Sequence, residues 1–142
     1  MDLHISSLID ILNHQPVKPT YLIRVVSSME GDYPVELPRS RFYVAGFEYR
    51  FDDTHPLIRS GVPLSDVMAE QMLREFEKER RNVEELVVVC LRGQNRSPAV
   101  GIALNEIFNL GQDSRALKKE YPEFNTFVYE KLIENAKRLK IK

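Results

Sequence analysis

Apolar residues along the chain fall into short runs that predict strands and longer periodic segments that predict helices. Residues 21–28 and 41–51 are rich in β-branched and aromatic side chains, which favours an extended conformation. Residues 86–89 are continuously apolar, which is typical of a strand buried on both faces of a parallel sheet. Residues 3–6 predict one further short strand. These segments are the candidate strands, and all of them lie before the last third of the chain.

Apolar residues at helical spacing occur in the remaining segments. In the first of them, Leu8, Ile9 and Leu12 share one helical face. In a later one, Pro98 stands in the first turn, where its missing N–H costs nothing, and Gly111 is placed to end the helix. The predicted helices are residues 6–14, residue 65 to the charged tail at 77–82, and residues 97–108, 114–121 and 124–139.

The order of these elements predicts an α/β fold. Strands alternate with helices and are followed by helices alone, which indicates a central, mostly parallel sheet of four to five strands, covered by helices on both faces. At 142 residues and 43% hydrophobic, the chain is long enough for a single domain spanning residues 1–142. In open sheets of this kind, ligands bind at the carboxyl ends of the strands.

Charge and cysteine content narrow the function classes. Twenty Lys and Arg against twenty-one Asp and Glu give a net charge of −1, so no global basic field favours nucleic acid. No apolar run approaches the length of a membrane span, and the N-terminus does not resemble a signal peptide. The single cysteine excludes an intramolecular disulfide and a multi-thiolate zinc site. We therefore expect a cytoplasmic monomer that needs no cofactor or metal.

The segment with the clearest chemistry follows the strand at 86–89. Cys90 is followed six positions later by Arg96 and then by a predicted helix. A tight loop that ends at a helix N-terminus turns its backbone N–H groups toward one point, which makes an anion-binding nest. Gly93 suits the turn, Arg96 offers a planar fork for two phosphoryl oxygens, and Ser97 is placed to donate to the sulfur. Such donors favour a thiolate at the cysteine.

A lone cysteine at the end of an apolar strand is often only a small buried hydrophobe. The combination of Gly93, Arg96 and Ser97 with a strand before and a helix after favours a phosphate site instead. The sequence CLRGQNRS at 90–97 resembles the signature of the cysteine-based protein tyrosine phosphatase superfamily, Cys-x2-Gly-x2-Arg-Ser/Thr. Its place in the chain, with an acidic loop upstream, is similar to the dual-specificity branch and to predicted prokaryotic and phage tyrosine phosphatases.

Two features separate this chain from relatives of that superfamily. The family usually has His before the nucleophile, where this chain has Val89. Low-molecular-weight tyrosine phosphatases also read Val-Cys-x5-Arg-Ser-Pro, but their motif lies near the N-terminus and an Asp-Pro loop follows it. Here no Asp-Pro follows the motif. Chain order therefore favours the dual-specificity-phosphatase-like fold.

The resemblance implies a set of site residues. Cys90 is the expected nucleophile and Arg96 the expected phosphate-binding side chain. The general acid is expected on the loop upstream, with Asp53 as first choice and Asp52 as second. Asp66 is better explained as a helix-start residue. The residues expected to bind the phosphate are Leu91, Arg92, Gly93, Gln94, Asn95, Arg96 and Ser97.

The acidic loop also has a simpler interpretation, because Asp-Asp-Thr-His-Pro at 52–56 is good turn chemistry. Within it, His55 could modulate the acid, although a solvated loop histidine is the commoner case. For His4 and His14 a surface or capping role is the better expectation. Arg92 is either a contact for an acidic or phosphorylated partner or a solvated surface charge.

The resulting hypothesis is a tyrosine or dual-specificity phosphatase that hydrolyses phosphate monoesters through a thiophosphate on Cys90. Phosphotyrosine in proteins is the expected substrate, with phosphoserine and phosphothreonine or a small aryl phosphate as further options. The uncharged Leu91, Gln94 and Asn95 disfavour polyphosphorylated inositol, and no aromatic and basic stretch supports RNA. A non-catalytic phosphoprotein-binding protein and, with an external thiol, an arsenate reductase remain as alternatives.

Overall fold

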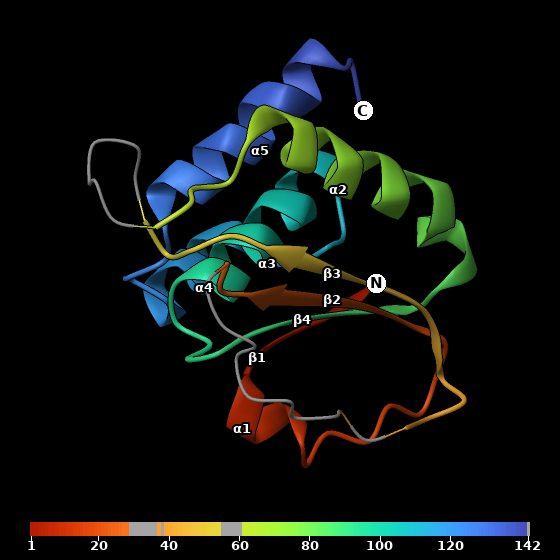
Figure 1. Ribbon diagram of the computed structural model, residues 1–142. Coiled ribbons are helices and arrows are strands. Elements are labelled where there is room, and N and C mark those ends of the chain that lie inside the picture. Colours follow the sequence, from red (N-terminus) through yellow and green to blue (C-terminus); the bar gives the residue numbers. More distant parts are fainter. Residues whose placement is uncertain (29–36, 38, 55–60, 142) are drawn as a thin grey trace.

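The computed structural model describes residues 1–28, 37, 39–54 and 61–141 (Figure 1). The predicted strands and helices are present in the described residues, with bounds that differ by a few residues. Within these ranges, no helix has both the length and the apolar character needed to cross a membrane. The elements are β1 (Asp2–Ser7), α1 (Leu8–Ile11), β2 (Thr20–Val26), β3 (Tyr43–Arg50), α2 (Asp66–Glu79), the 3₁₀ turn η1 (Arg80–Asn82), β4 (Glu85–Cys90), α3 (Arg96–Phe108), α4 (Ser114–Glu120) and α5 (Thr126–Arg138).

The four strands of the described chain form one parallel sheet in the order β1-β4-β2-β3. The predicted α/β class, with a parallel sheet of four strands flanked by helices, is therefore confirmed. Strand β4 lies between β1 and β2, and its last residue, Cys90, is paired with Ser7 at the end of β1. Val26 and Arg50 are paired at the ends of β2 and β3. The carboxyl ends of the strands thus form one edge of the sheet, and Cys90 lies on it.

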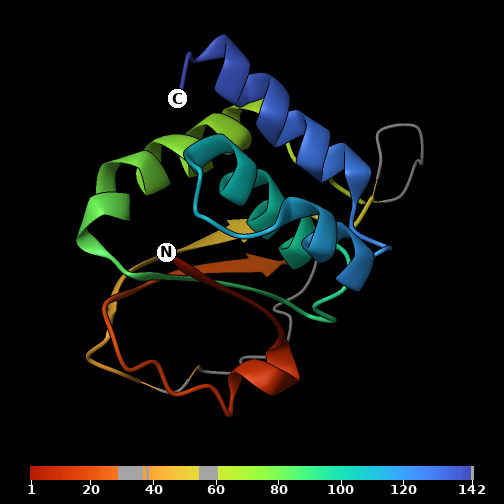
Figure 2. The ribbon, with the colours of Figure 1, turned by 180° about the vertical axis from the view of Figure 1, so that it is seen from behind.

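The two faces of the sheet are covered unequally. Helices α2, α3 and α5 pack over one face, whereas the other, as far as residues 1–28, 37, 39–54 and 61–141 show, carries the short α1 and connecting segments (Figures 1 and 2). Alternate residues of β4 divide between these layers: Leu86, Val88 and Cys90 belong to the large core under the helices. Val87 and Val89 belong to a small second cluster. The sequence predicted both faces to be covered, but not that one layer would be this thin.

Helix α1 differs from its prediction in length and phase. Residues 6 and 7 still belong to β1, and the Ser7 side chain accepts the N–H of Asp10 and caps a helix of a single turn. Leu8 and Ile11 are the buried residues, whereas Ile9 is 75% exposed. The predicted apolar face of Leu8, Ile9 and Leu12 was therefore wrong, because a single turn starting at Leu8 turns positions 8 and 11 to the sheet.

Helix α3 lies close against the sheet and is buried along most of its length. Gly101 permits this approach, because a Cβ there would lie 2.9 Å from the side chain of Ile5 on β1. The helix ends at Asn109, which has a left-handed backbone with φ 53°. Gly111 was predicted for that role and lies two residues further on. The close packing of α3 places its N-terminus beside Cys90.

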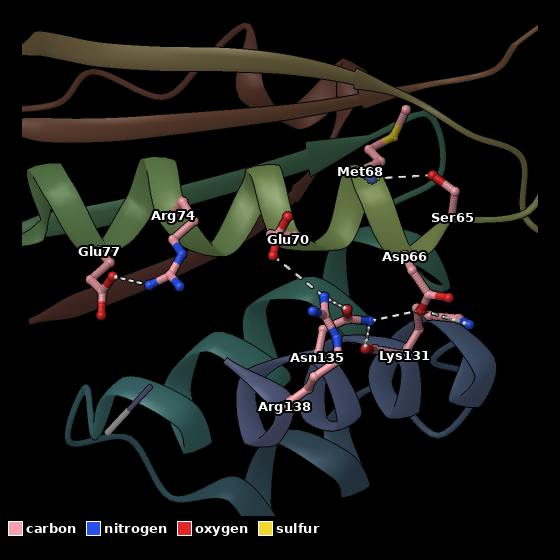
Figure 3. A network of polar contacts seen from close by, with 9 residues as sticks. All are labelled: Ser65, Asp66, Met68, Glu70, Arg74, Glu77, Lys131, Asn135 and Arg138. Carbon is pink, nitrogen blue, oxygen red and sulfur yellow. Dashed lines mark hydrogen bonds and ion pairs between the residues drawn. The ribbon is translucent and has the colours of Figure 1, made fainter. Parts of the chain in front are cut away.

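Helix α2 begins as predicted, with Ser65 accepting the N–H of Met68. Asp66 in its first turn accepts a hydrogen bond from Asn135 at 3.0 Å and pairs with Lys131 at 3.1 Å, both on α5 (Figure 3). The Asn135 bond and the Lys131 charge hold the pKa of the Asp66 carboxyl below its usual value of 3.8. Asp66 is therefore ionised and lies in the first turn of α2, as the helix-start interpretation predicted. Its contacts with α5 were not predicted from the sequence.

Candidate active site

The loop after Cys90 is packed against the end of β1. Its residue Gly93 is buried and has φ +69°, a conformation that residues with a Cβ rarely adopt. A Cβ at this position would lie 2.5 Å from the backbone nitrogen of Ser7. Both the turn and the close approach therefore require glycine, and the peptide N–H groups of the loop are held in place by the strand behind them.

The Cys90 sulfur is the acceptor around which this loop is organised. The backbone N–H groups of Gly93 and Ser97 both donate to Sγ at 3.3 Å. In the neutral thiol, Sγ donates to the Ser97 hydroxyl at 3.2 Å, and that hydroxyl donates to the carbonyl of Ser6 at 3.3 Å. If the proton leaves, the Ser97 hydroxyl is placed to turn and donate to the sulfur. Two backbone donors, one hydroxyl and a helix N-terminus thus favour negative charge at this atom.

Arg96 closes the loop and is fixed from the neighbouring strands. It is only 6% exposed, and its Nη1 donates to the carbonyl of Phe51 at 2.9 Å and to the Ser27 hydroxyl at 3.3 Å. Phe51 directly follows β3 and Ser27 directly follows β2. The guanidinium is therefore held at the carboxyl edge of the sheet in one orientation. Both of these hydrogen bonds use Nη1. The guanidinium would therefore bind an anion through Nε and Nη2.

The remaining loop residues divide between outer and inner positions. Leu91, Arg92 and Gln94 are exposed, whereas Asn95 is half-buried. The Asn95 side-chain amide donates to the carbonyl of Glu123 at 2.8 Å. Of the predicted phosphate-binding set, the structure thus places Gly93, Arg96 and Ser97 inside the loop, and the side chains of Leu91, Arg92 and Gln94 outside it.

Val89, the departure from the usual histidine, lies on the opposite face of β4 from Cys90. It is fully buried in the small cluster with Leu8, Ile11 and Val87. The strand end before the loop is therefore supported on that side by apolar packing.

Asp52 has an environment that makes it a poor proton donor. Its carboxylate accepts the N–H of Ser28 at 2.9 Å, the Ser28 hydroxyl at 2.6 Å and the N–H of Val62 at 2.6 Å. Burial acts to raise its pKa, but these hydrogen bonds and the Arg96 charge together hold the pKa of Asp52 below the usual 3.8. The group is ionised and ties residues 28, 52 and 62 together.

Asp53 is exposed, and its carboxyl is held from outside its own loop. Its Oδ1 accepts a hydrogen bond at 2.8 Å from the side-chain amide of Asn125. The backbone N–H of Asn125 donates in turn to the carbonyl of Asn95 in the Cys90 loop at 2.9 Å. The first-choice acid is therefore connected to that loop through a single residue.

Sequence reasoning did not identify Asn125. The predicted helix began at residue 124, whereas α5 begins at Thr126 and is capped by the Asn125 side chain, which accepts the N–H of Val128. An asparagine directly before an amphipathic segment is a helix-capping signal that could have marked it. Its contact with Asp53 joins two residues that are distant in the sequence, and no feature of the sequence indicated that contact.

The histidines are not at this site as far as the structure describes them. His4 and His14 stack at 4.2 Å, and Nε2 of His14 lies 3.2 Å from Oε1 of Glu85. Burial and the neighbouring His14 hold the pKa of His4 below its usual 6.5. Both line a cavity of about 420 Å³ beside the outer side of the loop. His55 lies outside the described residues.

Among the residues that the structure describes, no group of three or more His, Cys, Asp or Glu side chains is arranged to hold a metal ion. No protein-family model matches the chain, and no curated protein matches it either. Among solved structures, the fold is similar to one described as "Crystal structure of Tk-PTP in the active form", with 21% identity, a TM-score of 0.45 and 78% of each chain covered. A likeness of this extent does not bear on the chemistry, which rests on the geometry of the site.

Proposed function

We propose that this chain is a phosphatase that hydrolyses phosphate monoesters, with Cys90 as nucleophile. One observation carries the proposal: a buried cysteine sulfur accepts two backbone N–H groups at 3.3 Å, at the N-terminus of a helix whose first residue is a buried arginine. A cysteine that served only as a small hydrophobe would gain nothing from this set of donors. The same arrangement suits an anion with several oxygens, which backbone N–H groups and a guanidinium bind together.

In the proposed reaction, the Cys90 thiolate attacks phosphorus while the bond from phosphorus to the ester oxygen breaks. Arg96 and the backbone N–H groups of residues 91–96 bind the phosphoryl oxygens and stabilise charge in the transition state. Asp53 gives its proton to the departing oxygen. The ionised Asp53 then takes a proton from water, which displaces the sulfur and releases inorganic phosphate. The sum is hydrolysis of the ester by one water.

For the substrate we propose a phosphorylated protein, with phosphotyrosine favoured over phosphoserine and phosphothreonine, or a small aryl phosphate. Leu91 supports an aryl group, because it is 39% exposed and follows the nucleophile directly. We further propose that residues 1–142 act as a single dual-specificity-phosphatase-like domain, as a monomer in the cytoplasm.

The test is turnover of an aryl phosphate by the purified protein in the presence of a metal chelator. We expect release of phosphate by the wild type and loss of at least about 10³-fold in kcat for Cys90→Ser, with phosphate binding retained. Asp53→Asn should lower kcat mainly for substrates with poor leaving groups. A phosphopeptide panel in the same assay ranks phosphotyrosine against phosphoserine and phosphothreonine.

Two outcomes would overturn the mechanism: full activity of Cys90→Ser, or turnover that the chelator abolishes. Binding of phosphopeptides by the wild type with no turnover would instead identify a phosphate-binding protein. If Asp52→Asn gives the leaving-group dependence expected for Asp53→Asn, then Asp52 and not Asp53 is the general acid.

A further inference from the structure

Asn125 lies where three parts of the molecule meet. Its side-chain Oδ1 accepts the N–H of Val128 at 3.0 Å and caps α5. Its backbone N–H donates to the carbonyl of Asn95 at 2.9 Å. Its side-chain Nδ2 donates to Oδ1 of Asp53 at 2.8 Å and to the carbonyl of Thr54 at 3.5 Å. One residue thus contacts the acid loop, here residues 52–54, the phosphate loop, here residues 90–96, and helix α5.

Asn125 is itself held firmly relative to the phosphate loop. The Asn95 carbonyl accepts its backbone N–H, while the Asn95 side chain donates in the other direction to the carbonyl of Glu123. Two hydrogen bonds of opposite direction therefore join residues 123–125 to the end of the loop. Any group held by the Asn125 side chain has a fixed position relative to the proposed nucleophile.

The bond to Asp53 also distinguishes its two carboxyl oxygens. An amide N–H is only a donor, so the oxygen that it contacts must act as an acceptor. Oδ1 of Asp53 has this role. In the protonated carboxyl, the proton is then carried by Oδ2, because a proton on Oδ1 would compete with the amide hydrogen for the same space.

We propose that Asn125 is a positioning residue that fixes the Asp53 carboxyl against the phosphate loop and makes Oδ2 the proton-donating oxygen. The inference rests on the proposed function, in which Asp53 is the general acid. Asn125 takes no part in bond making. It acts through Asp53, first on the step in which the leaving oxygen receives its proton and then on the step in which Asp53 takes a proton from water.

The first experiment compares two aryl phosphates. Phenyl phosphate needs a proton on its leaving oxygen, whereas 2,4-dinitrophenyl phosphate releases a stable phenolate without one. For Asn125→Ala we expect kcat/KM for phenyl phosphate, which covers the steps up to transfer of the phosphoryl group to Cys90, to fall on the order of 10-fold to 10²-fold, because a misplaced catalytic group loses rate of that order. With 2,4-dinitrophenyl phosphate, kcat/KM should change less than about 3-fold, because the step up to transfer of the phosphoryl group needs no proton donor for this leaving group.

A matched control separates this effect from the loss of a helix cap. Ser65→Ala removes the side-chain cap of α2, which accepts the N–H of Met68 away from the site. The two alanine variants should lose similar stability, measured as a similar decrease in Tm, because each loses one side-chain helix cap. Only Asn125→Ala should acquire the dependence on leaving group. If Asn125→Ala does not fold, Asn125→Ser keeps a capping oxygen, lacks the amide donor and should give the same dependence.

The second experiment is a double-mutant cycle with Asp53→Asn. If Asn125 acts through Asp53, then Asp53→Asn combined with Asn125→Ala should be no slower on phenyl phosphate than Asp53→Asn alone. The proposal would be overturned if the rate losses of Asp53→Asn and Asn125→Ala multiplied in the double variant. It would also be overturned if Asn125→Ala lowered the rate equally on both aryl phosphates. These failures differ from a failure of the proposed function, in which the wild type itself has no turnover or Asp53→Asn shows no dependence on leaving group.

Discussion

The phosphate loop and the acid loop meet at the carboxyl edge of the sheet but hold their functional groups by different means. Cys90 is 3% exposed and Arg96 is 6% exposed, and backbone groups supply most of their partners. Asp53 is exposed, and one side-chain amide from another element holds its carboxyl. Backbone donors packed against a strand move little. The half of the site proposed to bind phosphate is therefore preorganised, and the half proposed to transfer the proton depends on a few side-chain contacts.

This difference predicts how the two regions respond to substitution. Changes in the phosphate loop should reduce turnover of every substrate, since binding and transition-state stabilisation use the same donors. Changes around Asp53 should lower kcat/KM only for substrates whose leaving group needs a proton. The following substitutions test this division, starting from the largest expected effect.

Gly93→Ala should have the largest effect, because it adds a Cβ at φ +69° and 2.5 Å from the Ser7 backbone. We expect kcat/KM to fall on the order of 10³-fold on both phenyl and 2,4-dinitrophenyl phosphate, since several donors of the loop move together. The free energy of unfolding should fall by about 2–3 kcal/mol, measured by denaturant titration.

Gly111→Ala is the matched control for that substitution. Gly111 also has a positive φ, 94°, but a Cβ there would meet no atom within 4 Å. It should therefore lose only the backbone contribution, about 1 kcal/mol, and keep its activity. If Gly93→Ala is as active as this control, the phosphate loop is not preorganised by its packing on β1.

Arg96→Lys should follow, because it keeps the charge and loses the planar fork. We expect kcat/KM to fall on the order of 10²-fold for both aryl phosphates, with phosphate affinity by calorimetry weakened in parallel. Arg92→Lys is the comparison, since Arg92 is exposed on the outside of the loop. A loss confined to phenyl phosphate would place Arg96 in proton transfer and remove the division between the two regions.

Asp52→Asn should have the smallest effect on activity, less than about 5-fold, because Asp52 anchors its loop and Asp53 is the proposed proton donor. It should lower the free energy of unfolding by about 1–2 kcal/mol at neutral pH, since it weakens hydrogen bonds to a charged acceptor. The pKa of Asp52 is below 3.8 in the folded protein, so the stabilisation is present above that pH and is lost as pH falls through the lower, folded value.

Thermal unfolding of wild type and Asp52→Asn as a function of pH measures this. The difference in Tm should be constant at neutral pH and should close below about pH 3.8. A gap that widened at low pH would contradict the assignment of Asp52 as an ionised anchor.

Periodicity and motif spacing alone predicted most of what surrounds Cys90. The apolar run at 86–89 predicted a buried strand because a central parallel strand must be apolar on both sides, and β4 is such a strand. The need for glycine at 93 was predicted from local turn chemistry, and φ +69° shows that requirement. These features are local, so a short stretch of sequence is sufficient to specify them.

The phase of α1 and the end of α3 were predicted less well. Ile9 was expected to share one helical face with Leu8 but is 75% exposed while Leu8 is buried, because the strand continues to Ser7 and leaves only one helical turn. Gly111 was expected to end α3, and Asn109 does so instead. In both cases more than one position was compatible with the local sequence pattern, for the buried face of α1 and for the end of α3. The packing of each helix on the sheet selected the position that is observed.

The sequence by itself determined the α/β class and the composition of the loop at 90–97. Both depend on local patterns: the order of strand and helix segments, and the spacing of Gly93, Arg96 and Ser97 after Cys90. Tertiary structure alone decided how Asp52 differs from its neighbour Asp53. The backbone N–H groups of Ser28 and Val62 donate hydrogen bonds to the Asp52 carboxylate. The Asp53 carboxylate instead accepts one from the side-chain amide of Asn125, which is distant in the sequence. Two adjacent aspartates are equivalent in sequence, and only the donors that folding brings to each carboxyl give them different chemistry.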